Sequence, residues 1–156
     1  MKITAWRITQ TKYATNAFSG LGAWLEGARW NPKGTYMVYA TGSVSLAAFV
    51  VLVNLHRSDK LFDLYVPNSI EFDSKQVLVL EENELPPDWN SYPPGEATQK
   101  IGEKWLKSNR SVVLRVPSVV IPEGHNYLIN PMHKDFKTLI IGTARRFVFD
   151  RRLNKE

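Results

Sequence analysis

The chain has 156 residues, of which 44% are hydrophobic and 22% charged, which fits one globular domain and leaves no length for a second. It contains no cysteine, which excludes disulfides, thiolate nucleophiles and cysteine-ligated zinc or iron–sulfur clusters. The formal net charge of +5 is compatible with nucleic acid, an anionic cofactor or an acidic protein partner. The one dense basic run is typical of a solvated surface or a frayed tail (Arg145, Arg146, Arg151, Arg152 and Lys155).

Neither an export signal nor a membrane span is predicted. Residues 1–11 are interrupted by polar side chains throughout and lack the apolar core of a signal peptide. The longest apolar run, 46–53, is far shorter than the roughly 20 residues that a helix needs to cross a bilayer. We therefore expect a cytoplasmic protein that makes no contact with membranes.

The first half of the chain predicts strands, a turn and one long helix. Strands are predicted where β-branched and aromatic residues gather (3–8, 36–40 and 61–66). Between the first two strands we expect a loop with a short helical piece at 21–25 and a proline-glycine turn at 31–34. A helix at 43–55 can be capped by Ser43 or Ser45. Because this helix is apolar almost all round, we expect it to be buried on more than one side.

The second half alternates short strands with proline-rich breaks at 85–89 and 93–95. An amphipathic helix is predicted at 98–107, with apolar residues on one face and lysines and glutamates on the other. Further strands are predicted in the remaining apolar runs (77–80, 111–116 with a continuation at 119–121, 127–129, 139–141 and 146–149). Helices inserted among more numerous strands indicate a mixed α+β domain.

Common catalytic motifs are absent from the sequence. His56, His125 and His133 do not have the spacing of metal ligands, so no metal site is predicted. No nucleophile elbow, phosphate-binding loop or dinucleotide-binding glycine motif is present. Arg29, however, lies between small residues and a proline-glycine turn, and Tyr39 follows on the next predicted strand. An arginine fork suits a diphosphate and an aromatic ring can stack on a nicotinamide; a structural arginine and a core tyrosine are the alternative.

Three motifs occur in the order found in RES domains: GARWNPKGTYMVYATGSVSLA, ELPPDW and LRVPSVVIPEGHNYLINPMHKDF. The chain resembles this family from about residue 6 to residue 149. RES proteins are toxins of bacterial toxin–antitoxin pairs. The resemblance implies one compact domain over 1–156, similar in fold to ADP-ribosyltransferases, with helices inserted around a mixed sheet.

The resemblance also implies a substrate and a partner. RES toxins consume NAD by cleaving the nicotinamide–ribose bond, through hydrolysis, phosphorolysis or ADP-ribosyl transfer, and the sequence does not indicate which acceptor applies. Their usual partner is an Xre-type helix-turn-helix antitoxin, which we expect to cover the NAD pocket. Nucleic acid would then be contacted only indirectly, through the antitoxin.

The family's functional positions can be matched to this chain motif by motif. Arg29 should hold the NAD phosphates and Trp30 should line the pocket. Tyr39 should stack near the nicotinamide, and Ser118 should form a hydrogen bond with the cofactor. Tyr13 is a weaker candidate for the wall of the pocket.

One position departs from the family pattern. A glutamate is expected in the middle of the helix at 43–55, where this chain has Val50. In the family that glutamate binds the ribose hydroxyls and stabilises the positive charge that develops on the ribose, which valine cannot do. Val50 is either natural or a substitution that permits expression of a toxic protein. Two other functions stay open: a non-catalytic RES protein that only binds its antitoxin, and a basic nucleic-acid-binding module.

Overall fold

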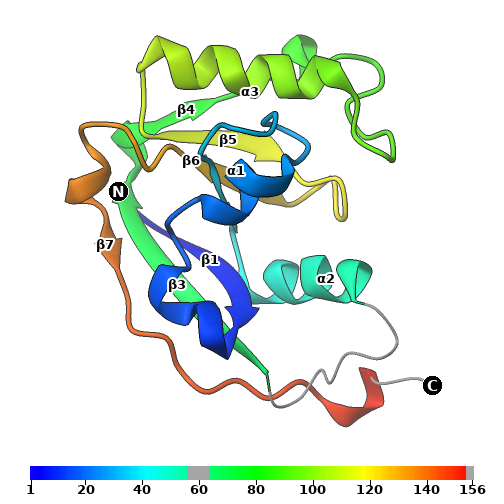
Figure 1. The fold of residues 1–156 in the computed structure, drawn as a ribbon, viewed down its shortest axis with the longest axis vertical. Helices are drawn as coiled ribbons and strands as arrows, with labels where there is room; N and C mark the ends of the chain where they lie inside the picture. Colours follow the sequence, from blue (N-terminus) through cyan, green and yellow to red (C-terminus); the bar gives the residue numbers. More distant parts are fainter. Residues whose placement is uncertain (56–63, 154–156) are drawn as a thin grey trace.

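The computed structural model, which describes residues 1–55 and 64–153, is built on a mixed seven-stranded sheet (Figure 1). The strands follow the order β4-β5-β6-β2-β1-β3-β7 across the sheet. Their bounds are β1 Lys2–Gln10, β2 Val38–Thr41, β3 Tyr65–Asp73, β4 Val77–Val79, β5 Val113–Pro117, β6 His125–Ile129 and β7 Ile140–Ile141. β4 and β5 pair in parallel, and the other neighbouring strands pair antiparallel.

The helices of the described chain lie around this sheet. They are α1 Leu21–Glu26, α2 Val44–Asn54 and α3 Glu96–Ser108, with 3-10 turns η1 Thr11–Asn16, η2 Ser74–Gln76, η3 Glu82–Glu84, η4 Phe136–Thr138 and η5 Arg151–Leu153. Figure 1 shows α3 along β4 and β5, and α2 beside the end of β1. Among the described residues, no helix is both long enough and apolar enough to cross a membrane.

Two apolar layers cover opposite faces of the sheet. Tyr127 of β6 belongs to one layer, where its ring meets Phe72 edge to face at 5.3 Å. The next residue, Leu128, belongs to the other layer together with Trp30 and Trp105 of α3. This follows from the pleat of the strand, because successive side chains point to opposite faces.

Helix α2 packs by one side only. Ala47 lies in a third apolar cluster with Ile8 of β1 and Phe149 of the C-terminal segment. On the outer side, Phe49 and Val53 are 49% and 62% exposed. The prediction that this helix is buried on more than one side is therefore wrong, because α2 lies at the periphery of the described chain with the sheet on one side of it.

β1 and β2 are joined at one register pair, Trp6 with Thr41, whereas β1 pairs with β3 along its whole length. Next to that pair, β1 and β2 are linked by a hydrogen bond from a side chain and not by backbone pairing. Nη1 of Arg7 donates a hydrogen bond to the carbonyl of Tyr39 at 3.1 Å. The first strand is thus tied to the strand of the predicted site through a guanidinium.

Most predicted elements are confirmed, and the α+β class with them. Strands were expected and are present near 3–8, 36–40, 77–80, 111–116, 127–129 and 139–141, as are helices near 21–25, 43–55 and 98–107. The predicted strand at 61–66 is partly outside the described residues, and β3 continues well beyond it to Asp73. Pro67 is tolerated there because β3 pairs with β7 only at residues 70–71, so on that side the missing N–H breaks no ladder bond.

Two predicted strands are wrong. The stretch 119–121 is bent and leads into a turn at 122–123, which is closed by a bond from Gly124 N to the carbonyl of Ile121 at 2.8 Å. The stretch 146–149 has no regular secondary structure and pairs with no strand among the described residues. Its apolar alternation comes from Phe147 and Phe149, whose rings meet edge to face at 4.8 Å in the cluster beneath α2.

Candidate functional site

The loop between α1 and β2 is held by Asn31, which is completely buried. Its Oδ1 accepts a hydrogen bond from the hydroxyl of Tyr39 at 2.6 Å, and that hydroxyl accepts one from Trp30 N at 3.1 Å. The Nδ2 of Asn31 donates to three backbone carbonyls, those of Ala23, Pro32 and Thr35, at 2.9, 3.0 and 3.2 Å. The loop that carries Arg29 is therefore fixed to β2 through one amide and one phenol.

Tyr39 is a neutral phenol near two cations. Burial raises its pKa well above the ordinary value of 10.0. The hydrogen bond from Trp30 and the charges of Arg29 and Arg7 act in the opposite direction without overcoming the effect of burial. Two guanidinium groups thus lie close enough to this tyrosine to affect its ionisation.

Arg29 is half-buried and bonded to the proline-rich segment before α3. Its Nη1 donates to the carbonyls of Trp89 at 2.9 Å and Ser91 at 2.7 Å. Partial burial lowers its pKa, but an arginine remains a cation at any physiological pH. Both bonds use one nitrogen, and within the described chain no bond is made by Nη2 and Nε. That edge of the fork can receive two oxygens of an anion.

Arg7 is a site residue that sequence reasoning missed. Its Nε is buried and has no hydrogen-bond partner among the described residues, and burial lowers the pKa of its guanidinium. An arginine between Trp6 and Ile8 in a half-buried strand is unusual, because arginines are rarely buried unless paired. That pattern could have singled it out before the structure was known.

Val50 lies on the flank of α2. One turn earlier, Leu46 packs so closely on Gly124 that an added Cβ there would lie 2.8 Å from its Cδ2. Residues four apart share a helix face, so Val50 lies along the same flank and is half-buried. Its carbonyl accepts a bond from Nδ2 of Asn54 at 2.8 Å. Its expected place beside Arg29 and Tyr39 stays a prediction.

The side chains of Trp30 and Ser118 are buried against other parts of the protein. Trp30 is 1% exposed, in the layer beneath α3, so the part of it that meets Tyr39 is its backbone amide. Ser118 is completely buried, and its Oγ accepts a bond from Ile121 N at 3.2 Å, closing the turn between β5 and β6. Their predicted contacts with NAD remain predictions.

Tyr13 lies in η1 and is 55% exposed. The ammonium of Lys12 lies 5.0 Å from the centre of its ring. No hydrogen bond links Tyr13 to the other predicted site residues in the described chain. The structure therefore brings together Arg29, Trp30 and Tyr39 and leaves Tyr13 outside that group.

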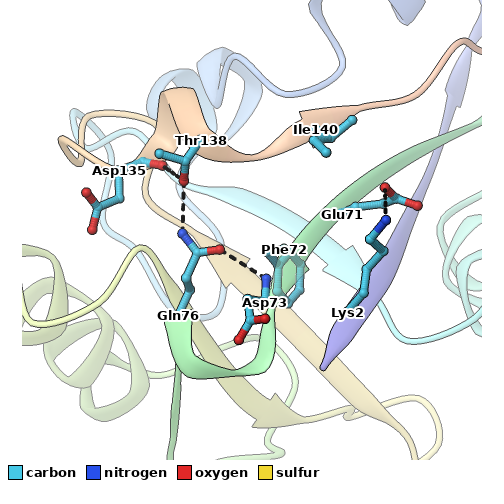
Figure 2. A pocket seen from close by; sticks show the side chains of 8 residues that line it. All are labelled: Lys2, Glu71, Phe72, Asp73, Gln76, Asp135, Thr138 and Ile140. Atoms are coloured by element: carbon cyan, nitrogen blue, oxygen red, sulfur yellow. Dashed lines mark hydrogen bonds and ion pairs between the residues drawn. The ribbon is translucent and has the colours of Figure 1, made fainter.

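Two surface hollows lie away from these residues. The first, about 480 Å³, is formed between β3, η2, η4 and β7 (Figure 2). There Gln76 joins the backbone N–H of Asp73 to the hydroxyl of Thr138, and Lys2 reaches Glu71 at 3.7 Å. These polar groups pair with one another, which indicates a structural link. The second hollow, about 390 Å³, lies between η1, β3 and the C-terminal segment at 144–147.

Within residues 1–55 and 64–153, no three His, Asp or Glu side chains are grouped as a metal site would require. His133 is buried and bonded on both ring nitrogens, to the carbonyl of Asn109 at 3.1 Å and the N–H of Asp135 at 3.0 Å. Burial and the charge of Arg115 lower the pKa of His125. His56 lies outside the described residues.

The family model described as the RES domain matches residues 4–150. The chain belongs to the RES-domain family. It is 40% identical over 152 residues to a protein named Toxin Res from Photorhabdus laumondii, covering 96% of both chains. It is 33% identical over 160 residues to the Prs ADP-ribosylating toxin of a Sphingobium species, covering 98% of both chains.

The fold of this RES protein is also found in a solved structure. The neighbour comes from the crystal structure of the M. tuberculosis MbcT–MbcA toxin–antitoxin complex, with a TM-score of 0.78 over 95% of this chain and 85% of that one. Sequence identity between the two is 18%, so this likeness concerns the fold. The single-domain α+β architecture expected from the sequence is confirmed.

Proposed function

We propose that this RES protein is the toxin of a toxin–antitoxin pair and that it acts on NAD in the cytoplasm. The observation that carries this proposal is the similarity, over nearly the whole chain, to proteins named as toxins, one of them named for ADP-ribosylation. In the proposed reaction the bond between nicotinamide and ribose breaks, and its electron pair leaves with neutral nicotinamide. The ribose cation is captured by water, phosphate or a protein side chain, which loses a proton.

The described residues fit a dinucleotide. Arg29 offers the Nη2–Nε edge of its fork, and Arg7 has a buried Nε that is not bonded within the described chain. Both charges act on Tyr39, so two cations lie near the ring proposed to contact the nicotinamide. A diphosphate bears two negative charges, and two guanidiniums near one tyrosine match it.

Val50 is proposed to impair catalysis and spare binding. A carboxylate near the scissile bond stabilises the developing ribose cation, and loss of one preorganised electrostatic group commonly lowers kcat by about 100- to 1000-fold. Ground-state contacts from Arg29 and Tyr39 do not depend on that carboxylate. We therefore expect NAD binding with little or no turnover in this chain.

The test is to measure NAD cleavage by the chain as it stands and by Val50→Glu. Turnover should rise at least about 100-fold in Val50→Glu. Val53→Glu is the matched control, because it places the same carboxylate one turn further along α2 on a side chain that is 62% exposed. Arg29→Ala should weaken NAD binding in titration calorimetry by at least about tenfold, as for loss of a charge-assisted pair. An inert Val50→Glu with an intact fold would favour a non-catalytic RES protein.

The proposed partner is an Xre-type antitoxin that covers the NAD pocket. The solved neighbour was crystallised with its antitoxin, and α2 of this chain exposes Phe49 and Val53 beside Val50. Two exposed apolar side chains next to each other on one helix side offer a surface for a protein contact. Titrating NAD into the toxin alone and into the purified pair checks this. NAD binding of equal strength in both would exclude a partner that covers the pocket.

A further inference from the structure

Two buried side-chain atoms of the described residues have no hydrogen-bond partner: Nε of Arg7 and Oδ1 of Asn126. A buried acceptor without a donor costs free energy, so native proteins retain few of them. Arg7 is bonded to the backbone of Tyr39 and belongs to the site already described. Asn126 has no role in that site or in the fold as described so far.

Asn126 faces the side of the sheet that carries the site. Its neighbour Tyr127 points into the layer formed with Phe72, so Asn126 points to the opposite face, with Leu128. On the adjacent strand, Tyr39 pairs with Leu128 and Thr41 pairs with Asn126. Asn126 therefore lies two residues along the strand pair from Tyr39, on the same face.

The nearest hydroxyl on the paired strand does not satisfy this amide. Oγ1 of Thr41 is 2.7 Å from the carbonyl of Ser43 and donates its hydrogen there. A hydroxyl has one hydrogen to donate, so Thr41 has none left for Asn126. Oδ1 of Asn126 therefore has no hydrogen-bond donor within the described chain, although the hydroxyl of Thr41 lies on the paired residue.

The start of α2 lies beside Asn126. Gly42 N donates to the carbonyl of His125 at 3.0 Å, and Leu46 packs on Gly124. Val50 continues the flank that begins with Leu46. Asn126 therefore stands at the α2 end of the site, where the bond to nicotinamide is broken in the proposed reaction.

The geometry points to Asn126 as a specificity residue whose Oδ1 accepts a hydrogen bond from the carboxamide N–H of nicotinamide. This inference rests on the proposed function, since it requires NAD as the ligand. The carboxamide supplies the donor that the buried oxygen lacks. ADP-ribose, which has no nicotinamide, would leave Asn126 unpaired.

Two variants and two ligands test the inference. Asn126→Leu removes the acceptor at similar volume, and titration calorimetry measures its binding of carbocyclic NAD, which cannot be cleaved, and of ADP-ribose. We expect carbocyclic NAD to bind about three- to tenfold more weakly than to the wild-type chain, as for loss of one hydrogen bond, and ADP-ribose to bind unchanged. Arg29→Ala, in contrast, should weaken the binding of both ligands.

Thermal unfolding separates ligand recognition from a structural role. Asn68→Leu is the matched control, because Asn68 is another asparagine of the sheet and is buried, but its Nδ2 donates to the carbonyl of Arg7, to Oγ1 of Thr9 and to the carbonyl of Val66. Asn68→Leu should lower the melting temperature, whereas Asn126→Leu should leave it unchanged or raise it, since an unpaired acceptor is removed.

Three outcomes would overturn the inference. One is carbocyclic NAD binding to Asn126→Leu as it does to the wild-type chain. Another is an equal loss of affinity for both ligands, which would place the contact on the ADP-ribose part. A third is a fall in melting temperature matching that of Asn68→Leu. If the wild-type chain binds neither ligand, the proposed function fails as well, which distinguishes that failure from one confined to Asn126.

Discussion

Gly102 in α3 offers a direct test of how the site is held against the helix. A Cβ added at this position would lie 1.7 Å from the carbonyl oxygen of Trp30 and 2.8 Å from its carbonyl carbon, where ordinary contact begins at 3.4 Å. Both clashing atoms are backbone, so no side chain can rotate away. Gly102→Ala therefore requires α3 to withdraw from the loop by about 1.5–2 Å, which loosens the packing of Trp105 against Trp30.

The size of the effect follows from two opposing contributions. Alanine stabilises a helix interior by about 1 kcal/mol relative to glycine. Overpacking of a tight contact costs about 1–3 kcal/mol and occasionally more, and a backbone clash of this size belongs at or above the upper end. We expect a net loss of about 2–3 kcal/mol in the free energy of unfolding. For a chain of this length that lowers the melting temperature by roughly 4–12 °C.

The assay is urea unfolding followed by circular dichroism, with NAD affinity measured on the same samples. Gly22→Ala in α1 is the matched control, since a Cβ there meets no atom within 4 Å and its effect should be neutral or stabilising. NAD binding should weaken in Gly102→Ala alone, because Arg29 precedes Trp30 in the displaced loop. A Gly102→Ala protein within about 0.5 kcal/mol of the wild type would refute the reasoning.

Three further predictions follow from single contacts. Tyr39→Phe leaves Trp30 N–H and Asn31 Oδ1 unpaired in the interior, so urea unfolding should show a loss of about 2–4 kcal/mol; a loss below about 1 kcal/mol would contradict it. Because burial raises the Tyr39 pKa in the folded state, its contribution to stability is complete below pH 10 and declines as the unfolded tyrosine ionises above it. Between pH 10 and 11 the wild type should therefore lose up to about 1.4 kcal/mol relative to Tyr39→Phe, and parallel curves would show that Tyr39 ionises normally. Ser43 caps α2 by accepting a bond from Leu46 N at 3.0 Å, so Ser43→Ala should cost about 1 kcal/mol while Ser45→Ala stays within about 0.5; equal effects would show that the cap is not decisive.

Local patterns in the sequence predicted most of the elements, because strand and helix periodicity depends on near neighbours. The cap at Ser43, the turn at 31–34 and the amphipathic face of α3 are features of this kind. The exposure of Phe49 and Val53 is different, since it depends on which elements reach α2 in the folded chain. No pattern within an apolar helix indicates on which side the core lies.

The candidate site was predictable only in part. Arg29 and Tyr39 were singled out by residue type and family resemblance, and the structure places both of them around Asn31. Arg7 could have been noticed as an arginine inside an apolar strand, whereas Asn126 was missed because its significance lies in an unpaired atom, a property of the folded state. Trp30 was expected in the pocket wall, which stays a prediction; the structure shows its indole buried beneath α3.

The single register pair between β1 and β2 has a consequence for how the molecule opens. The sheet consists of two groups of paired strands. One group contains β1, β3 and β7, and the other contains β2, β4, β5 and β6. The two groups are joined at the register pair Trp6–Thr41 and by the hydrogen bond from the guanidinium of Arg7 to β2. Because so few bonds join the two groups, separating them should require less free energy than separating the paired strands within either group. Amide hydrogen exchange should therefore show two groups of strands with different degrees of protection. A ligand that binds to both Arg7 and Tyr39 would hold the two groups together, so their amides should then exchange with similar protection.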